Sequence, residues 1–179
     1  MFYLFLADGF EETEALAPLD MMRRAKIEVK TVGVTGEVVT GSHGVPVKAD
    51  LNPEEISYND IEGVVLPGGM PGTINLIKSD AVAKATTYCF ENNKITAAIC
   101  AAPSVLGNLG ILKGKKATCF PGFEKELEGA TYTAAPVEVD GNVITGKGAG
   151  CAILFGKAIV EKVLSAEAAN KVCGDMQCP

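Results

Sequence analysis

The sequence predicts an α/β fold in which a mostly parallel sheet is covered by helices on both faces. Apolar runs of strand length, such as residues 2–7 and 95–99, alternate with longer segments of helical periodicity. This alternation is typical of chains that build a parallel sheet between two helical layers. Functional sites in such sheets form at the carboxyl edge of the strands, so the turns that follow the strands are the first places to search.

The expected elements follow one another in a regular order. Strands are expected at residues 2–7, 27–34, 63–66, 95–99 and 116–120. Helices are expected at residues 13–25, 80–92, 101–109, 151–164 and 166–173, with a helical turn at 123–127. One hairpin is expected between 37–40 and 45–48, and a second over 137–145 with Asp-Gly at its turn. Pro18 should kink the first helix or mark its true start, because proline removes a helical hydrogen bond.

Length and composition predict a single globular domain that neither binds nucleic acid as its main partner nor spans a membrane. The 179 residues fit one domain, 1–179, with a short loose tail from about residue 174. A hydrophobic content of 47% with 21% charged residues is typical of a globular chain. The net charge of −6 and the lack of a long basic run argue against nucleic acid as the main partner. The apolar stretches are too short to span a membrane, and the apolar start is interpreted as a first strand rather than a signal peptide.

The cysteines are spread through the chain. They lie at positions 89, 100, 119, 151, 173 and 178. No CxxC pair occurs among them, so neither a disulfide framework nor a zinc site is predicted, and a reducing cytoplasm is the expected location. The chain has a single histidine, His43, which limits the available acid–base mechanisms.

One stretch has the layout of a nucleophile elbow. Residues 96–99 are apolar and extended, Cys100 follows, and small residues with helical promise come directly after it. Such a turn exposes a side chain at the carboxyl edge of the sheet, and the free N–H groups of the next helix favour an anion there. The thiol of Cys100 is therefore expected to ionise easily. The alternative is a structural cysteine, since free cysteine often packs as a small buried hydrophobe.

Four segments should meet at this edge. They are the loop over residues 8–14, the Pro-Gly-Gly turn at 67–69, the Cys100 elbow and the loop near Cys119 and Phe120. The glycines allow backbone N–H groups to approach a ligand or a neighbouring side chain closely.

The motifs in these segments resemble one known family. The relevant residues are Gly9-Phe10-Glu11-Glu12-Thr13-Glu14, Pro18 to Ala25, Val65-Leu66-Pro67-Gly68-Gly69 and Ala98-Ile99-Cys100-Ala101-Ala102-Pro103. In order and spacing they are similar to the DJ-1/ThiJ/PfpI family, in particular to the branch that contains the Parkinson-linked redox protein and small bacterial relatives. The resemblance implies a flavodoxin-like three-layer sandwich and a homodimer that uses the first helix and the nearby hairpin.

The resemblance also assigns roles to individual residues. It implies that Cys100 is the nucleophile and that Glu14 is a protonated carboxyl that hydrogen-bonds the thiolate. It places Gly68, Gly69, Ala101 and Phe120 around a substrate or anion pocket, with no metal and no organic cofactor. The residues alone favour another interpretation of Glu14, namely a solvated carboxylate in the first turn of a helix.

The sequence departs from the family pattern in one respect. Some members carry a general-base histidine in the loop that matches residues 119–121, where this chain has Phe120, and no histidine follows Cys100. His43 could contribute only from another part of the fold or from a second subunit, and a lone loop histidine is more often solvated. Cys119 is expected in the core, with a resolving thiol at the pocket mouth as the alternative.

These observations give four functional hypotheses. The first is an enzyme that adds Cys100 to small reactive aldehydes such as methylglyoxal, as a glyoxalase or deglycase, with help from Glu14. The second is an oxidative-stress sensor or chaperone in which Cys100 is oxidised to sulfinate without turnover. A cysteine peptidase or amidase is disfavoured by the missing histidine, and a purely structural domain leaves the converging motifs unexplained. The expected partners are a small carbonyl compound or an oxidant and a second copy of the chain.

Overall fold

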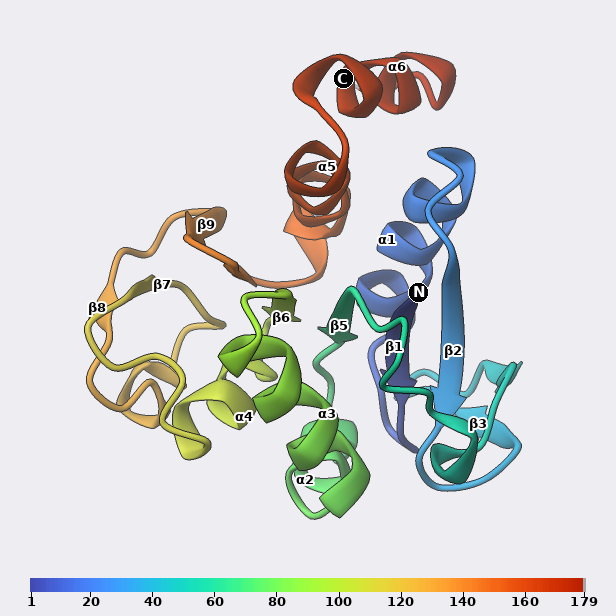
Figure 1. Cartoon of the computed structure of the whole chain (residues 1–179). Helices are drawn as coiled ribbons and strands as arrows, with labels where there is room; N and C mark the ends of the chain where they lie inside the picture. Colours follow the sequence, from blue (N-terminus) through green and yellow to red (C-terminus); the bar gives the residue numbers. More distant parts are fainter. Residues whose placement is uncertain (179) are drawn as a thin grey trace.

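The computed structural model describes residues 1–178 and contains one main sheet with helices on both faces (Figure 1). The strands lie in the order β2 (Val29–Gly33), β1 (Phe2–Leu6), β5 (Gly63–Leu66), β6 (Ile95–Ile99), β10 (Val143–Gly146) and β9 (Val137–Asp140). All neighbours pair in parallel except β9 and β10, which form the predicted Asp-Gly hairpin. The predicted α/β class with a mostly parallel sheet is confirmed.

The helices form two layers. Figure 1 shows α1 (Glu12–Arg24) and α5 (Ala152–Val163) on one face of the sheet, with α6 (Ala166–Asp175) beyond α5. The opposite face is covered by α2 (Gly72–Ile77), α3 (Asp80–Glu91) and α4 (Pro103–Asn108). Ser79 caps α3, because its hydroxyl accepts a hydrogen bond from Val82 N–H.

Alternate side chains of β1 belong to different cores. Phe2, Leu4 and Leu6 pack with α1 and α5, whereas Tyr3 and Phe5 pack with the layer of α3 and α4. This follows from the two-residue period of a strand, and it explains why β1 is apolar at every position.

The chain reverses direction beside β1. It passes from β1 through α1 to β2 at one edge, and then returns to place β5 on the other side of β1. A doubly wound sheet opens a crevice at such a point, outside the carboxyl ends of the strands. The loops after β1, β5, β6 and β10 all reach this edge.

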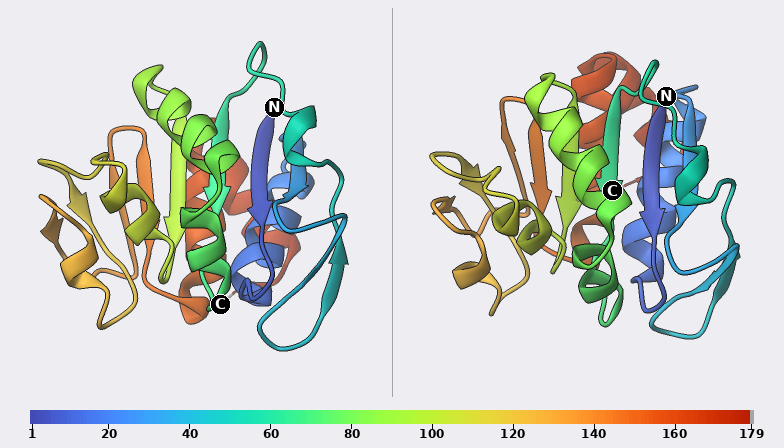
Figure 2. Two further views of the ribbon diagram at one scale, coloured as in Figure 1. Left: turned by 90° about the horizontal axis from the view of Figure 1, so that it is seen from below. Right: turned by 60° about the horizontal axis from the view of Figure 1, so that its bottom comes forward.

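Two small sheets lie outside the main one (Figure 2). The hairpin of β3 (Val38–Thr40) and β4 (Pro46–Lys48) forms as predicted. The strand predicted at 116–120 is wrong in extent. Only β7 (Lys116–Ala117) is extended, and it pairs with β8 (Thr131–Tyr132) rather than with the main sheet.

Other differences are local. The helix α2 was not predicted, since it is short and its segment has no helical periodicity long enough to detect. Three short 3₁₀ helices also occur, η1 (Pro53–Glu55), η2 (Glu124–Glu126) and η3 (Ala149–Cys151), and η2 corresponds to the predicted helical turn at 123–127. Pro18 lies inside α1 and does not mark its start. The predicted loose tail is wrong as far as residue 178, because α6 extends to Asp175 and a hydrogen-bonded turn follows it.

The packing of α5 gives a direct test of the fold. Phe155 has no exposed surface and packs against the sheet, whereas its neighbour Leu154 is 51% exposed. Phe155→Ala should lower the free energy of unfolding by about 3–5 kcal/mol, since it leaves a cavity in the core. Leu154→Ala should change it by less than about 0.5 kcal/mol. Urea titration followed by circular dichroism measures both, and equal losses would contradict this packing.

Candidate active site

The backbone of Cys100 is held in an unusual conformation. The residue follows β6 directly and has φ of +66°, in the left-handed region that costs a non-glycine residue about 1–2 kcal/mol. Hydrogen bonds hold it on both sides, from Cys100 N–H to the Gly146 carbonyl at 2.9 Å and from Phe120 N–H to the Cys100 carbonyl at 2.8 Å. The predicted sharp turn between strand and helix is therefore present, and such local strain is typical of functional positions.

Glycines make room for this turn. A Cβ atom added to Gly68 would lie 2.7 Å from the Cβ of Cys100 and 2.7 Å from a carboxyl oxygen of Glu14. Gly69 has φ of +90° and lies against the backbone of residues 9–11. The Pro-Gly-Gly turn therefore lies directly beside the elbow, as the topology predicts.

Glu14 lies between the elbow and this glycine turn. It occupies the first turn of α1 and is only 1% exposed, so it is not a solvated carboxylate. Gly68 N–H donates a 2.9 Å hydrogen bond to Glu14 Oε2. The Glu14 carboxyl and the Cys100 side chain lie side by side, since a Cβ added to Gly68 would lie 2.7 Å from an atom of each. The structure thus brings together Cys100, Glu14 and Gly68, while their roles stay a prediction.

The two side chains titrate as a pair. Burial raises the pKa of Glu14 to about 7, although hydrogen bonds from Cys100 and Gly68 N–H act in the opposite direction. Burial, followed by the charge of Glu14, raises the pKa of the Cys100 thiol to about 12. At pH values between about 7 and about 12, the Glu14–Cys100 pair therefore holds one proton, which can lie on the carboxyl oxygen or on the sulfur.

This result differs from the expectation that the thiol ionises easily. The N–H groups of Ala101 and Gly69 donate to the sulfur and lower its pKa, as expected of an anion pocket. The helix α4 begins only at Pro103 and has six residues, so it contributes little dipole. Burial and the neighbouring carboxylate outweigh the two donors, and the thiolate forms only when Glu14 takes up the proton.

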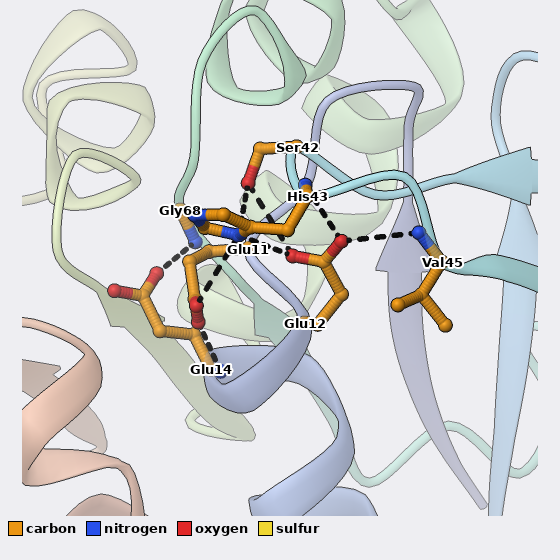
Figure 3. Close-up of polar contacts among 7 residues, drawn as sticks. All are labelled: Glu11, Glu12, Glu14, Ser42, His43, Val45 and Gly68. Carbon is orange, nitrogen blue, oxygen red and sulfur yellow. Dashed lines mark hydrogen bonds and ion pairs between the residues drawn. The ribbon is translucent and has the colours of Figure 1, made fainter.

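A second polar cluster lies at the start of α1 (Figure 3). The Glu12 carboxylate accepts hydrogen bonds from the backbone N–H of His43 at 2.7 Å and of Val45 at 3.4 Å, and its Oε2 is 2.8 Å from Nδ1 of His43. Burial raises the pKa of Glu12, but the hydrogen bonds from His43 and the backbone lower it to about 2 overall. The same pairing raises the pKa of the His43 imidazole, chiefly through its hydrogen bond to Glu12.

His43 is therefore tied to Glu12 and not to the thiol within this chain. Its side chain is 72% exposed, and a contribution to the pocket of a second subunit stays a prediction. Among the described residues, Glu11, Glu12 and His43 form one group whose ligand-type atoms lie within 4.8 Å of one another. The Glu12 oxygens accept hydrogen bonds from the loop between β3 and β4, and these hydrogen bonds account for the position of the loop without a metal ion.

Phe120 and Cys119, the predicted residues of the loop beside the elbow, differ in their exposure. Phe120 is 48% exposed and lies beside Gly148, and its N–H anchors the elbow. Cys119 is fully buried, so it is a core residue as expected and not a thiol at the pocket mouth.

In the described part of the chain, residues 1–178, no helix is long and apolar enough to cross a membrane.

Sequence reasoning missed two residues that shape the site. Glu11 caps α1, since its Oε2 accepts from Glu14 N–H at 2.7 Å, and it thereby orients the first turn that carries Glu14. Glutamate is an uncommon cap, so its position gave little signal. The Gly146 carbonyl that accepts from Cys100 N–H becomes visible only when β10 is placed beside β6.

Comparisons with known proteins identify a family model and several relatives that match this chain. A family model described as the DJ-1/PfpI family matches residues 2–162. DJ-1 homolog B from Arabidopsis thaliana is 40% identical over 90% of this chain, which spans only 37% of that relative's length. The Parkinson disease protein 7 homolog from Danio rerio is 37% identical over 94% of this chain and 92% of the relative. Deglycase TK1284 from Thermococcus kodakarensis is 35% identical over 79% of this chain and 86% of the relative.

Solved structures share the whole architecture. DJ-1beta from Drosophila melanogaster has a TM-score of 0.94 and 32% identity, covering 99% of this chain and 97% of that one. The oxidised form of DJ-1 from Toxoplasma gondii has a TM-score of 0.94 and 31% identity, covering 98% and 97%. The predicted flavodoxin-like fold is thereby confirmed.

The glycine turn provides one test of the site. Gly68→Ala should slow alkylation of Cys100 by iodoacetamide at least about tenfold, because the new methyl group displaces Glu14 or the thiol. Gly150→Ala is the matched control, since its added Cβ meets nothing within 4 Å. Peptide mass spectrometry gives both rates, and an unchanged rate in Gly68→Ala would contradict the close approach.

The shared proton predicts a pH profile. Alkylation of Cys100 should rise with pH through a midpoint near 7, where the pair loses its first proton. In Glu14→Gln the midpoint should move above the ordinary thiol value of about 8.5, because burial still opposes the thiolate and no carboxylate accepts its proton. Peptide-resolved alkylation rates between pH 5 and about 10 measure this shift. The same midpoint in both proteins would show that the two groups are not coupled.

Proposed function

Because the chain belongs to the DJ-1/PfpI family, we propose that it converts small reactive aldehydes such as methylglyoxal by a glyoxalase- or deglycase-like reaction at Cys100 and Glu14. One observation carries the proposal. A fully buried carboxyl, whose pKa burial raises to about 7, lies beside a thiol on a strained turn at the carboxyl edge of the sheet. A general acid–base group with a pKa near neutrality is well matched to move protons at physiological pH.

The first step is addition of the thiol to the aldehyde. The Cys100 sulfur bonds to the aldehyde carbon, Glu14 accepts the thiol proton, and the carbonyl oxygen then takes that proton to become a hydroxyl. The product is a hemithioacetal. In this proposal the backbone N–H groups of Gly69 and Ala101, whose hydrogen bonding lowers the pKa of the Cys100 thiol, stabilise the negative charge that develops during addition.

The second stage moves a hydrogen within the adduct. With methylglyoxal, Glu14 removes the proton from the former aldehyde carbon and an enediol forms. Return of a proton to the neighbouring carbon gives a thioester of the hydroxy acid. Water then breaks the thioester bond, which releases lactate and restores the Cys100 thiol, so the net reaction adds one water to methylglyoxal.

The relatives support the substrate class. Two archaeal relatives are named deglycases, one from Thermococcus kodakarensis and one from Pyrococcus abyssi. A peptidase fits this chain less well, because an amide needs more general-base help than an aldehyde. His43, the chain's histidine, is hydrogen-bonded to Glu12 and so is not the general base for Cys100 within this chain. The loop beside the elbow carries Phe120 where some family members carry a histidine.

Lactate formation tests the proposal. Cys100→Ser should reduce turnover of methylglyoxal at least about a hundredfold, since the sulfur nucleophile is lost. Glu14→Gln should reduce it by about 10²–10⁴-fold because the proton acceptor is removed. Cys151→Ser, which changes a half-buried thiol outside the site, should leave turnover unchanged. Turnover by Cys100→Ser equal to that of the parent protein would refute the proposal.

A second candidate function is oxidation sensing. It is favoured by the solved Toxoplasma gondii relative, which is an oxidised form and shares the fold at a TM-score of 0.94. A sulfinate on Cys100 could accept hydrogen bonds from protonated Glu14 and from the donors that now face the sulfur. Mild peroxide treatment followed by mass spectrometry distinguishes oxidation sensing from aldehyde turnover. Selective addition of two oxygens at Cys100, without lactate formation by the untreated protein, would favour sensing over catalysis.

A further inference from the structure

The carboxyl end of α6 has a well-defined backbone turn. Cys178 N–H donates to the Cys173 carbonyl at 2.9 Å, and Gln177 N–H donates to the Gly174 carbonyl at 3.0 Å. Gln177 has φ of +55°, in the left-handed region. These two hydrogen bonds and this φ together define a Schellman motif, which closes a helix by turning the chain back on its last turn.

The motif places two particular side chains against each other. In a Schellman turn the residue after the left-handed position commonly contacts the residue five positions earlier. Here both residues are cysteines, Cys178 and Cys173. Both are free and half-buried, and Cys178 contributes, after burial, to the raised pKa of the Cys173 thiol. From the sequence, a disulfide between these two tail cysteines is conceivable only after cell lysis and carries no function, since the pair is not a CxxC motif.

We propose that Cys173 and Cys178 form a reversible intramolecular disulfide at the end of α6 when the protein meets a hydroperoxide, as a redox site separate from Cys100. The turn already brings the two backbones within hydrogen-bonding distance, so little chain entropy must be lost to join the sulfurs. A disulfide across so short a loop in an accessible position belongs to the labile class that cellular thiols can reduce.

The chemistry balances with one molecule of hydrogen peroxide, the simplest hydroperoxide. One thiolate attacks the peroxide, its sulfur gains an oxygen to become a sulfenic acid, and one water leaves after protonation. The second thiol then attacks the sulfenic sulfur, the S–O bond breaks, and a second water leaves. Two thiols lose two electrons and two protons in total, and the peroxide is reduced to two waters. Two equivalents of a small thiol reverse the change by exchange.

The position of the pair keeps it apart from the elbow. Asp175, between the two cysteines, lies near Arg24 at the carboxyl end of α1 and contributes to the raised pKa of that guanidinium, whose main cause is its hydrogen bond to Asp20. Glu14, beside Cys100, lies at the opposite end of α1. The ten-residue step from Glu14 to Arg24 spans roughly 15 Å of helix. Cys100 is therefore not the direct partner of either thiol.

The test uses the full chain. The reduced protein is treated with a small excess of hydrogen peroxide, the remaining thiols are blocked with N-ethylmaleimide, and the protein is digested with trypsin. Cleavage after Lys171 leaves both cysteines in one peptide, residues 172–179. We expect that peptide to carry no maleimide, to weigh two hydrogens less than its reduced form, and to form at a rate independent of protein concentration. A doubly alkylated peptide, or a bridge to another chain or to Cys100, would overturn the proposal.

Two variants at Gln177 test whether the turn drives closure. Gln177→Gly keeps the left-handed conformation without a Cβ penalty, so the disulfide should form at least as fast as in the parent protein. Gln177→Val disfavours that conformation and should slow formation about fivefold. Equal rates in both variants would show that the Schellman geometry is not responsible.

A second pair of variants separates this site from the proposed enzyme. Cys100→Ser should still form the disulfide, and Cys178→Ser should lose it while keeping lactate formation unchanged. The disulfide should form in Cys100→Ser and be lost in Cys178→Ser even if the parent protein proved not to convert aldehydes. Loss of the disulfide in Cys100→Ser would instead show that the elbow oxidises the pair, contrary to the proposal.

Discussion

The close pairing of the Cys100 thiol with the buried Glu14 carboxyl constrains the architecture around it. A carboxyl with 1% exposure is costly to ionise, and the carboxylate has to be stabilised by donors. Gly68 N–H provides one such donor, and only a residue without a side chain fits at that point. The left-handed backbone of Cys100 brings the sulfur to the same place.

The supporting structure is distributed over three segments. Glu11 fixes the first turn of α1, the Glu12 cluster ties that turn to the β3–β4 loop, and Gly146 and Phe120 hold the two backbone groups of Cys100. Each of these contacts uses a polar group that would otherwise need a partner at the edge of the sheet. The strain at the elbow is therefore maintained by contacts from β10, α1 and the loop after β7, and does not depend on α4 alone.

Much of this arrangement is readable from the sequence. The apolar runs predict β1, β5 and β6, the Asp-Gly pair predicts the β9–β10 turn, and the strand-to-small-residue transition predicts the elbow at Cys100. The helix α2 is not predicted and the strand expected at 116–120 is predicted too long, because a few residues cannot establish a period. Burial of Glu14 is not predictable from its neighbours, since an acidic first turn is normally solvated, and only the family resemblance pointed to it. The thiol contact between Cys173 and Cys178 depends on a left-handed Gln177, which the sequence does not reveal.

The central claim is that one buried carboxyl and one thiol share a proton at neutral pH. Carbon-13 NMR titration of the Glu14 side-chain carboxyl, in the parent protein and in Cys100→Ala, tests it most directly. The account predicts a midpoint near 7 in the parent protein and a higher midpoint in Cys100→Ala, because the hydrogen bond from Cys100 lowers the pKa of Glu14. A midpoint near the ordinary value of 4.5, or one that does not change when the thiol is removed, would contradict it.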